Sequence, residues 1–188
     1  SINAGDWHLL TADPFPMRLS GVGLFKPKNT ILGADIAGYV EAVGRNVKQF
    51  RPGDAAFGDI FGLGSGSFAE YVSVPESALA LKPSNVSFEE AAAVPVAAVT
   101  ALQGLRDQGR IQPGQNVLIN GASGGVGTFA VQIAKAFGAE VTAVCSTRNL
   151  DLARSIGADQ AIDYKKEDFT QNGQRYDQIF AVNGYHPL

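Results

Sequence analysis

The glycine-rich segment between residues 116 and 135 constrains the fold more than any other part of the chain. It starts with an apolar run at residues 117–119, which has the length and composition of a buried parallel strand. The turn GASGGVG at 121–127 follows, and after it comes a helical pattern with apolar residues on one face as far as Phe137. Small residues let the backbone turn tightly and approach a phosphate, and the free N–H groups of the first helical turn then point at the anion. The segment therefore predicts the phosphate cradle of a dinucleotide-binding fold.

The spacing within the turn distinguishes two kinds of phosphate loop. Ala122-x-Gly124-x-x-Gly127 fits the G-x-G-x-x-G pattern of dinucleotide folds, with alanine in the first place. A P-loop would need glycine at position 126 and lysine at position 127, where this chain has Val126 and Gly127. The P-loop interpretation therefore fails.

The end of the next strand predicts which dinucleotide is bound. Residues 140–145 form the second predicted strand, and folds of this type place the residue that meets the adenosine ribose about 20 residues after the glycine turn. NAD-binding chains carry a carboxylate there, whereas this chain has Ser146 and Arg148. A guanidinium group pairs with phosphate oxygens through two parallel bonds, which favours the 2′-phosphate of NADPH. The alternative is an ordinary surface serine and arginine.

Composition and charge narrow the class of protein. The chain has 188 residues, of which 45% are hydrophobic and 18% charged, enough for one large or two small domains. A net charge of −3 without long runs of like charge argues against nucleic acid and membrane partners. The single cysteine excludes an internal disulfide framework and fits a reducing compartment, so we expect a cytoplasmic protein. Neither a membrane span nor a leader is visible, and the start at Ser-Ile-Asn without methionine suggests a fragment.

The first half of the chain has the pattern of a small β-domain. Prolines and glycines suggest loops over residues 1–30, and short predicted strands at 36–43, 55–57 and 68–74 are separated by glycine turns. Such strands suggest a small β-barrel or sandwich within residues 1–84. Ser87-x-x-Glu90 is a capping box that begins a short helix, and Pro95 begins a second one. We therefore assign residues 85–112 to linking helices.

The second half, residues 113–188, alternates strands and helices, which implies a parallel sheet with right-handed crossovers. After the second strand the pattern predicts a helix at 149–156, a third strand at 160–164, a helix and loop at 165–174 and a fourth strand at 176–182. Dinucleotide domains of this type have six strands in two halves. A sheet of four strands leaves an apolar edge, which we expect missing segments or a partner chain to cover.

Several separate motifs resemble one family: INAGD at 2–6, LGADIAG at 32–38, RPGD at 51–54, FAEYV at 68–72, AAVP at 92–95 and GASGGVG at 121–127. Together they resemble the zinc-independent medium-chain dehydrogenases/reductases, in the quinone oxidoreductase (zeta-crystallin-like) branch. The resemblance implies a partial GroES-like β-domain on the substrate side, followed by a partial Rossmann doubly wound parallel sheet that binds NADPH. It also implies that both ends of the family's chain are absent here. Full-length relatives are commonly dimers, so a homodimer is expected.

The same resemblance predicts that the chain has no zinc site. The positions of a catalytic cysteine and a ligand histidine in the zinc alcohol dehydrogenase branch correspond to Asn3 and Ala34. Catalytic zinc normally has three protein ligands with N, S or O atoms, and these residues cannot supply that set. The only cysteine is Cys145 on a predicted Rossmann strand, and His8 and His186 lack the spacing of ligands.

By resemblance, the chemistry is hydride transfer from NADPH to a quinone or an α,β-unsaturated carbonyl compound, without a metal. The resemblance places Asn3 near the nicotinamide, where its amide could orient either the ring or the substrate oxygen; the alternative is an asparagine of a turn. Thr100 matches a threonine that contacts the nicotinamide in relatives, or else it is an ordinary helix threonine. These two residues are the predicted catalytic ones.

The predicted cofactor-binding residues come from the second half. The backbone amides of Gly124, Gly125 and Val126 are expected to hold the pyrophosphate, next to the two residues assigned to the 2′-phosphate. Tyr164 matches a tyrosine near that phosphate in NADPH-using relatives, although it could simply pack at the end of a strand. Asn183 is expected to reach the ribose on the nicotinamide side.

Two other functions stay open at the level of sequence. One is a non-catalytic NADPH-binding protein, such as a sensor or a structural protein that retains the fold. The other is an enoyl reductase domain of a larger synthase.

Overall fold

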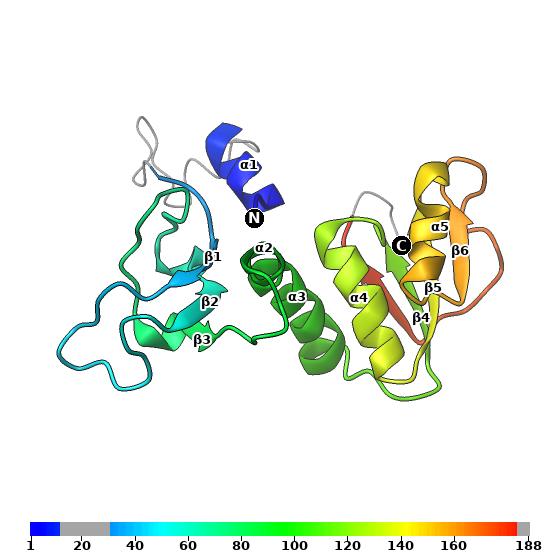
Figure 1. The fold of residues 1–188 in the computed structure, drawn as a ribbon. Coiled ribbons are helices and arrows are strands. Elements are labelled where there is room, and N and C mark those ends of the chain that lie inside the picture. Colours follow the sequence, from blue (N-terminus) through cyan, green and yellow to red (C-terminus); the bar gives the residue numbers. More distant parts are fainter. Residues whose placement is uncertain (12–30, 184–188) are drawn as a thin grey trace. The chain divides into compact units, whose positions relative to one another are not determined.

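The chain forms two compact units in a computed structural model that describes residues 1–11 and 31–183. Unit 1 is Ser1–Val96 and unit 2 is Ala97–Leu188, and each has a sheet of its own (Figure 1). The division falls within helix α3, Pro95–Leu102, inside the segment that the sequence suggests as linking helices.

Unit 1 is built on a three-stranded antiparallel sheet in the order β1-β2-β3. The strands are β1 Asp35–Tyr39, β2 Ala55–Asp59 and β3 Leu79–Leu81. The described part of the unit also contains helix α1, Ala4–Thr11, helix α2, Phe88–Ala93, and the short helical turns η2, Phe61–Leu63, and η3, Glu76–Ala78. The partial β-domain expected from the sequence is confirmed in this unit.

Helix α2, Phe88–Ala93, starts at the predicted capping box. The Ser87 hydroxyl accepts from the backbone N–H of Glu90 at 3.1 Å, and the Glu90 carboxylate accepts from the backbone N–H of Ser87 at 2.8 Å. The two bonds satisfy donors that have no partner inside the helix. Helix α3 then begins at Pro95, as predicted.

Unit 2 contains a four-stranded parallel sheet in the order β6-β5-β4-β7. Its elements are β4 Asn116–Asn120, α4 Gly125–Ala136, β5 Glu140–Cys145, η5 Thr147–Asn149, α5 Leu150–Ser155, β6 Gln160–Asp163 and β7 Gln178–Ala181. Numbered within the unit, the order is 3-2-1-4, which belongs to a Rossmann fold. The predicted strand–turn–helix alternation and the predicted fold class are confirmed.

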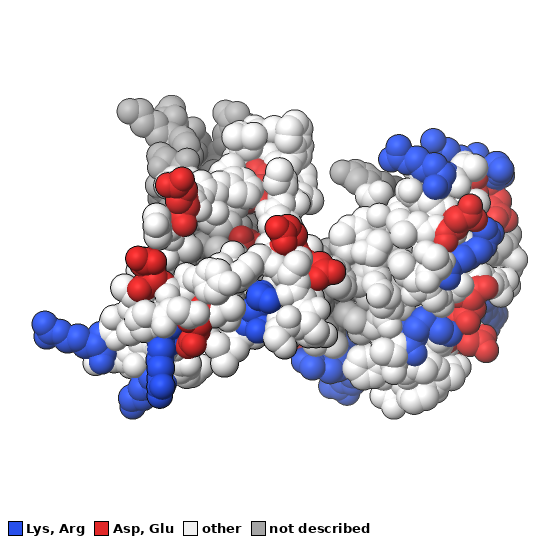
Figure 2. All heavy atoms as spheres, viewed as in Figure 1, with Lys and Arg blue, Asp and Glu red and all other residues white. Residues whose placement is uncertain are grey.

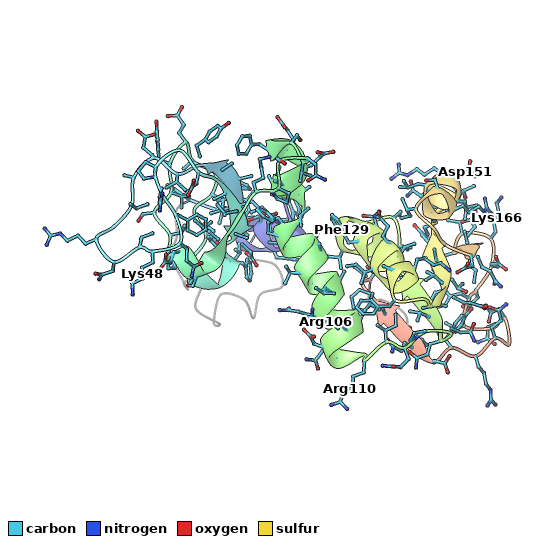
Figure 3. All side chains as sticks on the ribbon, turned by 60° about the horizontal axis from the view of Figure 1, so that its bottom comes forward. Lys48, Arg106, Arg110, Phe129, Asp151 and Lys166 are labelled. Atoms are coloured by element: carbon cyan, nitrogen blue, oxygen red, sulfur yellow. The ribbon has the colours of Figure 1, made fainter. Side chains whose placement is uncertain are left out.

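Side chains of the central strands fill cores on both faces of this sheet, because successive residues of a strand point to opposite faces. On one face Val117 and Ile119 pack with fully buried α4 residues such as Ala130, and Phe129 adds to this core from α4 (Figure 3). On the other face Leu118 clusters with Val144, Ile162, Phe169 and Tyr176.

After α3 the chain continues as a π-helical turn, η4, Gln103–Gln108, which lies against β7. A Cβ atom added at Gly104 would lie 2.3 Å from the ring of Phe180 on β7. An alanine at this position would therefore require the Phe180 ring to move. Leu105 from the same turn is fully buried in the core of unit 2.

Three elements differ from the predictions. Residues 68–74 alternate like a strand but form none, since β2 pairs with β1 and with β3 instead. Residues 165–174 form turns rather than a helix, because the carboxylates of Asp163 and Asp168 accept the backbone N–H groups of Lys165 and Thr170. Residues 4–11 form α1 where a loop was expected. The rest of that predicted loop, residues 12–30, lies outside the described residues.

Candidate functional site

The glycine turn between β4 and α4 has the geometry of a phosphate loop. Gly121 has a φ of +88°, and its N–H and that of Ala122 both donate to the Val144 carbonyl of β5 at 3.1 Å. A Cβ atom at Gly127 would lie 2.1 Å from the Gly121 carbonyl oxygen, so this close contact requires glycine. The left-handed residue is thus Gly121, one position before the first place of the G-x-G-x-x-G pattern. Ala122 fits that place because it is fully buried beside β5.

The first turn of α4 presents backbone donors at an exposed surface. Gly124 and Gly125 are both exposed. Within residues 1–11 and 31–183, no acceptor pairs with the N–H groups of Gly125 and Val126. The N–H of Gly124 is already used inside the turn, since it donates to the Gly121 carbonyl at 3.1 Å. Two of the three amides expected to hold a pyrophosphate are therefore available to an anion.

A polar cluster joins this turn to the end of β5. Ser146, which is 9% exposed, follows β5 directly. The amide nitrogen of Asn149 donates to the Ser146 hydroxyl at 3.2 Å and to the Ser123 hydroxyl at 2.9 Å. Sequence reasoning missed Asn149 and Ser123. The available signal was the position of Asn149, three residues after Ser146 and in the turn that a ribose phosphate would meet.

Arg148 and Tyr164 lie at the same end of the sheet as this cluster. Arg148 is exposed and makes no ion pair with any carboxylate of the described residues. Tyr164 is 50% exposed, and its backbone N–H donates to the Cys145 carbonyl at 3.2 Å, which places it beside the end of β5. Lys165 and Lys166 follow it. Figure 2 shows basic side chains gathered over this end of unit 2, and Figure 3 shows Lys166 at its periphery, with a side chain that is 70% exposed.

Asp163, at the end of β6, fixes the two turns that carry these residues. The Thr147 hydroxyl donates to it at 2.6 Å and the Lys165 backbone N–H at 3.1 Å. The bond from Thr147 lowers the pKa of Asp163; burial opposes this shift, and the Lys165 N–H adds to it. Asp163 is therefore a charged carboxylate at neutral pH, and its two oxygens are hydrogen-bonded to the turns on either side.

Asn183 lies on the other side of the glycine turn. The Asn120 side chain donates to the Asn183 carbonyl at 2.8 Å, and a Cβ atom at Gly121 would lie 3.2 Å from that of Asn183. This is the junction of β4 and β7, where the strand order reverses. Ligands of open α/β sheets bind outside the carboxyl ends of the strands at such a point. The predicted cofactor-binding residues thus all border the carboxyl edge of the sheet in unit 2.

Unit 1 holds the predicted catalytic residue Asn3 in a network with two buried carboxylates. The Asn3 side-chain nitrogen donates to Asp35 at 2.8 Å. Asp35 also accepts the backbone N–H of Val96 at 2.8 Å, and its side chain is fully buried. Asp6 accepts the backbone N–H groups of Asn3 and Gly33 at 2.8 and 3.0 Å. The sequence presents Asp6 and Asp35 only as parts of motifs, and nothing local in it assigns them to Asn3.

The other predicted catalytic residue, Thr100, belongs to unit 2 and lies exposed on α3. No group of three or more histidine, cysteine, aspartate or glutamate side chains in the described part of the chain could hold a metal ion, and His186 lies outside that part. The absence of zinc stays a prediction. None of the helices in residues 1–11 and 31–183 is long and apolar enough to cross a membrane.

Two family models match the chain. The alcohol dehydrogenase GroES-like domain matches residues 1–84, and the zinc-binding dehydrogenase model matches residues 125–184. Among curated proteins, the chain is 44% identical to the 2-methylene-furan-3-one reductase of Solanum lycopersicum, over 87% of this chain and 45% of that protein. It is 40% identical to an NADPH-dependent alkenal/one oxidoreductase, chloroplastic, of Arabidopsis thaliana, over 84% of this chain and 43% of that one.

A solved structure also resembles the chain along most of its length. The quinone oxidoreductase from Coxiella burnetii matches with a TM-score of 0.81 and 33% identity, over 90% of this chain and 52% of that chain. The chain thus spans about half the length of the proteins it matches.

Proposed function

The chain belongs to the medium-chain dehydrogenase/reductase family, in its quinone oxidoreductase branch, and on that premise we propose that it is an NADPH-dependent reductase. It would transfer hydride to a quinone or an α,β-unsaturated carbonyl compound without zinc. The observation that carries the proposal is the glycine turn of unit 2. Its N–H groups at Gly125 and Val126 pair with no acceptor among the described residues and lie beside the cluster of Ser146, Asn149 and Ser123.

The turn fits the pyrophosphate of a dinucleotide. Gly124 and Gly125 are exposed and have no side chain to obstruct a phosphate. The N–H groups of Gly125 and Val126 can donate to a phosphate oxygen. The positive end of the α4 dipole also attracts the phosphate, because a helix N-terminus favours anions. The contact of Gly127 with the Gly121 carbonyl holds the helix start against the turn.

The end of β5 supports NADPH over NADH. Ser146 and Arg148 stand where an NAD-binding chain would place a carboxylate for the ribose hydroxyls. The nearby carboxylate, Asp163, is committed to Thr147 and Lys165. Arg148 has no partner among the described carboxylates and can pair with a 2′-phosphate through two bonds. Tyr164 stands beside the same strand end.

The bound cofactor would supply the hydride. The protein's residues would bind the cofactor, orient it and exclude water, with Asn3 and Thr100 near the nicotinamide. A quinone or enone that receives hydride delocalises its negative charge, so hydrogen-bond donors can stabilise it without a metal. The names of the relatives, which include quinone, alkenal/one and furanone reductases, support this substrate class.

Two further properties belong to the same proposal. The exposed side of β7, which is the edge strand of the described sheet, supports a homodimer or additional strands from the same protein. The single cysteine supports a reducing compartment such as the cytoplasm, although the name of one relative places that protein in the chloroplast.

The first test is a calorimetric titration with NADPH and, separately, with NADH. Charge-assisted hydrogen bonds contribute about 1.5–3 kcal/mol, so Arg148→Ala should weaken NADPH binding by about 10- to 100-fold and leave NADH almost unaffected. Arg175→Ala is the matched control. It also removes an arginine from unit 2, but from a hollow at the amino edge of the sheet that Asn116 and Glu140 line as well.

Equal affinity for NADPH and NADH would refute the 2′-phosphate assignment. Turnover is tested next, by NADPH oxidation with a naphthoquinone and with an enone. A protein that binds NADPH with the expected preference but oxidises it with neither would be a binding protein, and the reductase proposal would be wrong.

A further inference from the structure

The side chain of Asn149 does not do what its place in the fold suggests. Asn149 directly precedes α5, a position at which an asparagine side chain commonly accepts an N–H of the helix, but no such capping bond forms here. Its amide nitrogen donates instead to the Ser123 hydroxyl at 2.9 Å and to the Ser146 hydroxyl at 3.2 Å. Both hydrogens of the amide nitrogen are thus used on hydroxyl groups, and the capping of α5 does not account for them.

The two bonds bring together two segments at the carboxyl edge of the sheet in unit 2. Ser123 belongs to the glycine turn before α4, and Ser146 directly follows β5. The two hydroxyl oxygens share one partner atom, so they lie at most about 6 Å apart. Two donors at that separation can bond to different oxygens of a single phosphate group. The backbone supports the arrangement, since the N–H of Asn149 donates to the Ser146 carbonyl at 2.8 Å.

Bonding to Asn149 also determines what the two hydroxyls can offer. A serine hydroxyl has one hydrogen to donate and accepts through its lone pairs. Ser123 and Ser146 both accept from Asn149, and no acceptor among the described residues pairs with the hydrogen of either hydroxyl. Each hydroxyl therefore keeps a donor for a ligand, and a phosphate dianion has only acceptors to offer.

The position and the charges of this cluster favour a phosphate on the adenosine ribose. Folds of this type place that ribose at the end of the second strand, which is where Ser146 stands. Arg148, in the same turn, is exposed and pairs with no carboxylate of the described residues. The carboxylate of Asp163 is bonded to Thr147 and Lys165 and does not accept from the two hydroxyls.

We propose that Asn149 is a positioning residue that aims the hydroxyl hydrogens of Ser123 and Ser146 at the 2′-phosphate of NADPH, and that the preference for NADPH over NADH depends on it. This inference rests on the proposed function, since it requires that the 2′-phosphate binds at this end of the sheet. Asn149 acts through the two serines and is not itself a contact of the phosphate.

The probes are 2′,5′-ADP and 5′-AMP, which differ only in the 2′-phosphate and carry no nicotinamide. Their dissociation constants, measured by calorimetry, give the preference for the 2′-phosphate as a ratio. We expect the wild-type protein to prefer 2′,5′-ADP and Asn149→Ala to lower that preference about tenfold, as for the loss of about one hydrogen bond to a charged group. The affinity for 5′-AMP should stay nearly unchanged. An equal loss for both ligands would show a merely structural role and would overturn the proposal.

The serines provide a readout that a direct contact would not give. In a protein that carries both Ser123→Ala and Ser146→Ala, Asn149 has no hydroxyl left to position. Adding Asn149→Ala to that protein should therefore change the preference by less than about twofold, because coupled residues lose their effect when the partner is absent. A further tenfold loss in the serine-free protein would mean that Asn149 acts on the ligand directly, and the proposal would be wrong.

Asn149→Asp tests the polarity and does not depend on the alanine variant folding. Aspartate has nearly the same size and is as good a residue as asparagine at the start of a helix. Its carboxylate can only accept, so it should turn the hydrogens of Ser123 and Ser146 toward itself and away from a phosphate. We expect this variant to bind 2′,5′-ADP no more tightly than 5′-AMP. A preference as large as that of the wild type would overturn the proposal.

Asn172→Ala is the matched control. Asn172 also belongs to unit 2 and also donates from its amide to a hydroxyl, that of Tyr176 at 3.3 Å, but it lies in the turns before β7. We expect it to keep the wild-type preference for 2′,5′-ADP. The same loss in Asn172→Ala as in Asn149→Ala would show a general effect on unit 2 and would contradict a specific role for Asn149.

The outcomes separate this inference from the function on which it rests. A protein that prefers 2′,5′-ADP, with the expected dependence on Asn149, but oxidises NADPH with neither a quinone nor an enone would refute the reductase and support the role of Asn149. A preference that survives Asn149→Ala would refute the role of Asn149 alone. A wild-type protein without any preference for 2′,5′-ADP would refute both this inference and the assignment of NADPH.

Discussion

Two glycines of the same turn should respond to alanine in opposite ways. A Cβ atom at Gly127 would lie 2.1 Å from the Gly121 carbonyl oxygen and 2.8 Å from two backbone atoms of Ala122. A Cβ atom at Gly124 would meet only the Gly121 carbonyl, at an ordinary 3.5 Å. Gly127 is therefore needed for the fold of the turn, whereas Gly124 is exposed on the side that a phosphate would approach.

The size of the effect at Gly127 follows from the atoms that would have to move. The obstacle is main chain, tied to β5 by the bonds of Gly121 and Ala122 to Val144, so it cannot rotate away as a side chain would. Overpacking of this kind costs about 1–3 kcal/mol, and we expect the upper end of that range. The better helix propensity of alanine offsets about 1 kcal/mol. Gly127→Ala should thus lower the free energy of unfolding by about 2 kcal/mol or more.

Urea denaturation followed by circular dichroism measures this loss. With m-values of about 1–3 kcal/mol per molar for small proteins, the midpoint of unit 2 should fall by about 1 M in Gly127→Ala. Gly124→Ala should lower the free energy of unfolding by no more than about 1 kcal/mol, because its only expected effect on the fold is that alanine is a poorer N-cap than glycine. Its effect should appear instead in binding, because the new methyl group stands where the pyrophosphate approaches; we expect at least about a tenfold loss of NADPH affinity.

Each of the two variants has an outcome that would contradict the prediction. A Gly127→Ala protein with the wild-type midpoint would show that the turn relaxes freely and that the contact with Gly121 is not a constraint. A Gly124→Ala protein that binds NADPH as tightly as the wild type would show that no phosphate approaches this part of the turn.

Two further predictions concern stability. Asp159 accepts from the Lys135 ammonium at 2.9 and 2.7 Å and from the Val141 N–H at 2.7 Å. Burial opposes ionisation of Asp159, but these bonds outweigh it and lower its pKa, so its contribution is present above pH about 4 and is lost as the pH falls through the lowered value. Asp159→Asn should therefore cost about 1 kcal/mol in urea denaturation at pH 7 and progressively less as the pH is lowered below about 4, and a loss that does not shrink with falling pH would contradict this. Ser87→Ala should lower the free energy of unfolding by about 1 kcal/mol, because it removes the capping bond to Glu90. Ser84 is exposed and has no described hydrogen bond, so Ser84→Ala should change the free energy of unfolding by no more than about 0.5 kcal/mol. Equal losses in the two variants would argue against the cap.

The parts of the fold that the sequence predicts correctly follow from short-range rules. The strand at 117–119, the glycine turn and helix α4 form one continuous segment in which apolar period, small residues and helix start agree. The capping box at Ser87 is similarly local, since both bonds join residues three apart. In these places the neighbours in sequence are also the neighbours in space.

The missed elements depend on partners that are distant in sequence. Residues 68–74 alternate as a strand should, but alternation does not show whether a free strand edge is within reach, and β2 is paired on both sides. β3 has only three residues and owes its existence to its pairing with β2. The helix expected at 165–174 fails for a different reason: aspartate side chains offer the backbone local bonds that compete with a helix.

The candidate site divides along the same line. Two glycines of the turn matter because they have no side chain, and the backbone geometry of the turn itself excludes other residues at these positions. The polar residues act through an orientation set by a partner, which is 32 positions away for Asn3 and Asp35 and 26 positions away for Asn149 and Ser123. A single sequence names the residue types and leaves these pairs invisible.

The two remote pairs set opposite polarities. Asp35 occupies a donor of Asn3 and leaves its oxygen as an acceptor. Asn149 donates to the hydroxyls of Ser123 and Ser146, so each hydroxyl keeps its own hydrogen to give away, which is what a phosphate oxygen requires. In unit 1 a carboxylate thus leaves an amide oxygen as an acceptor, and in unit 2 an amide leaves two hydroxyl hydrogens as donors. The arrangement in unit 2 is the one that the proposed binding of a 2′-phosphate requires.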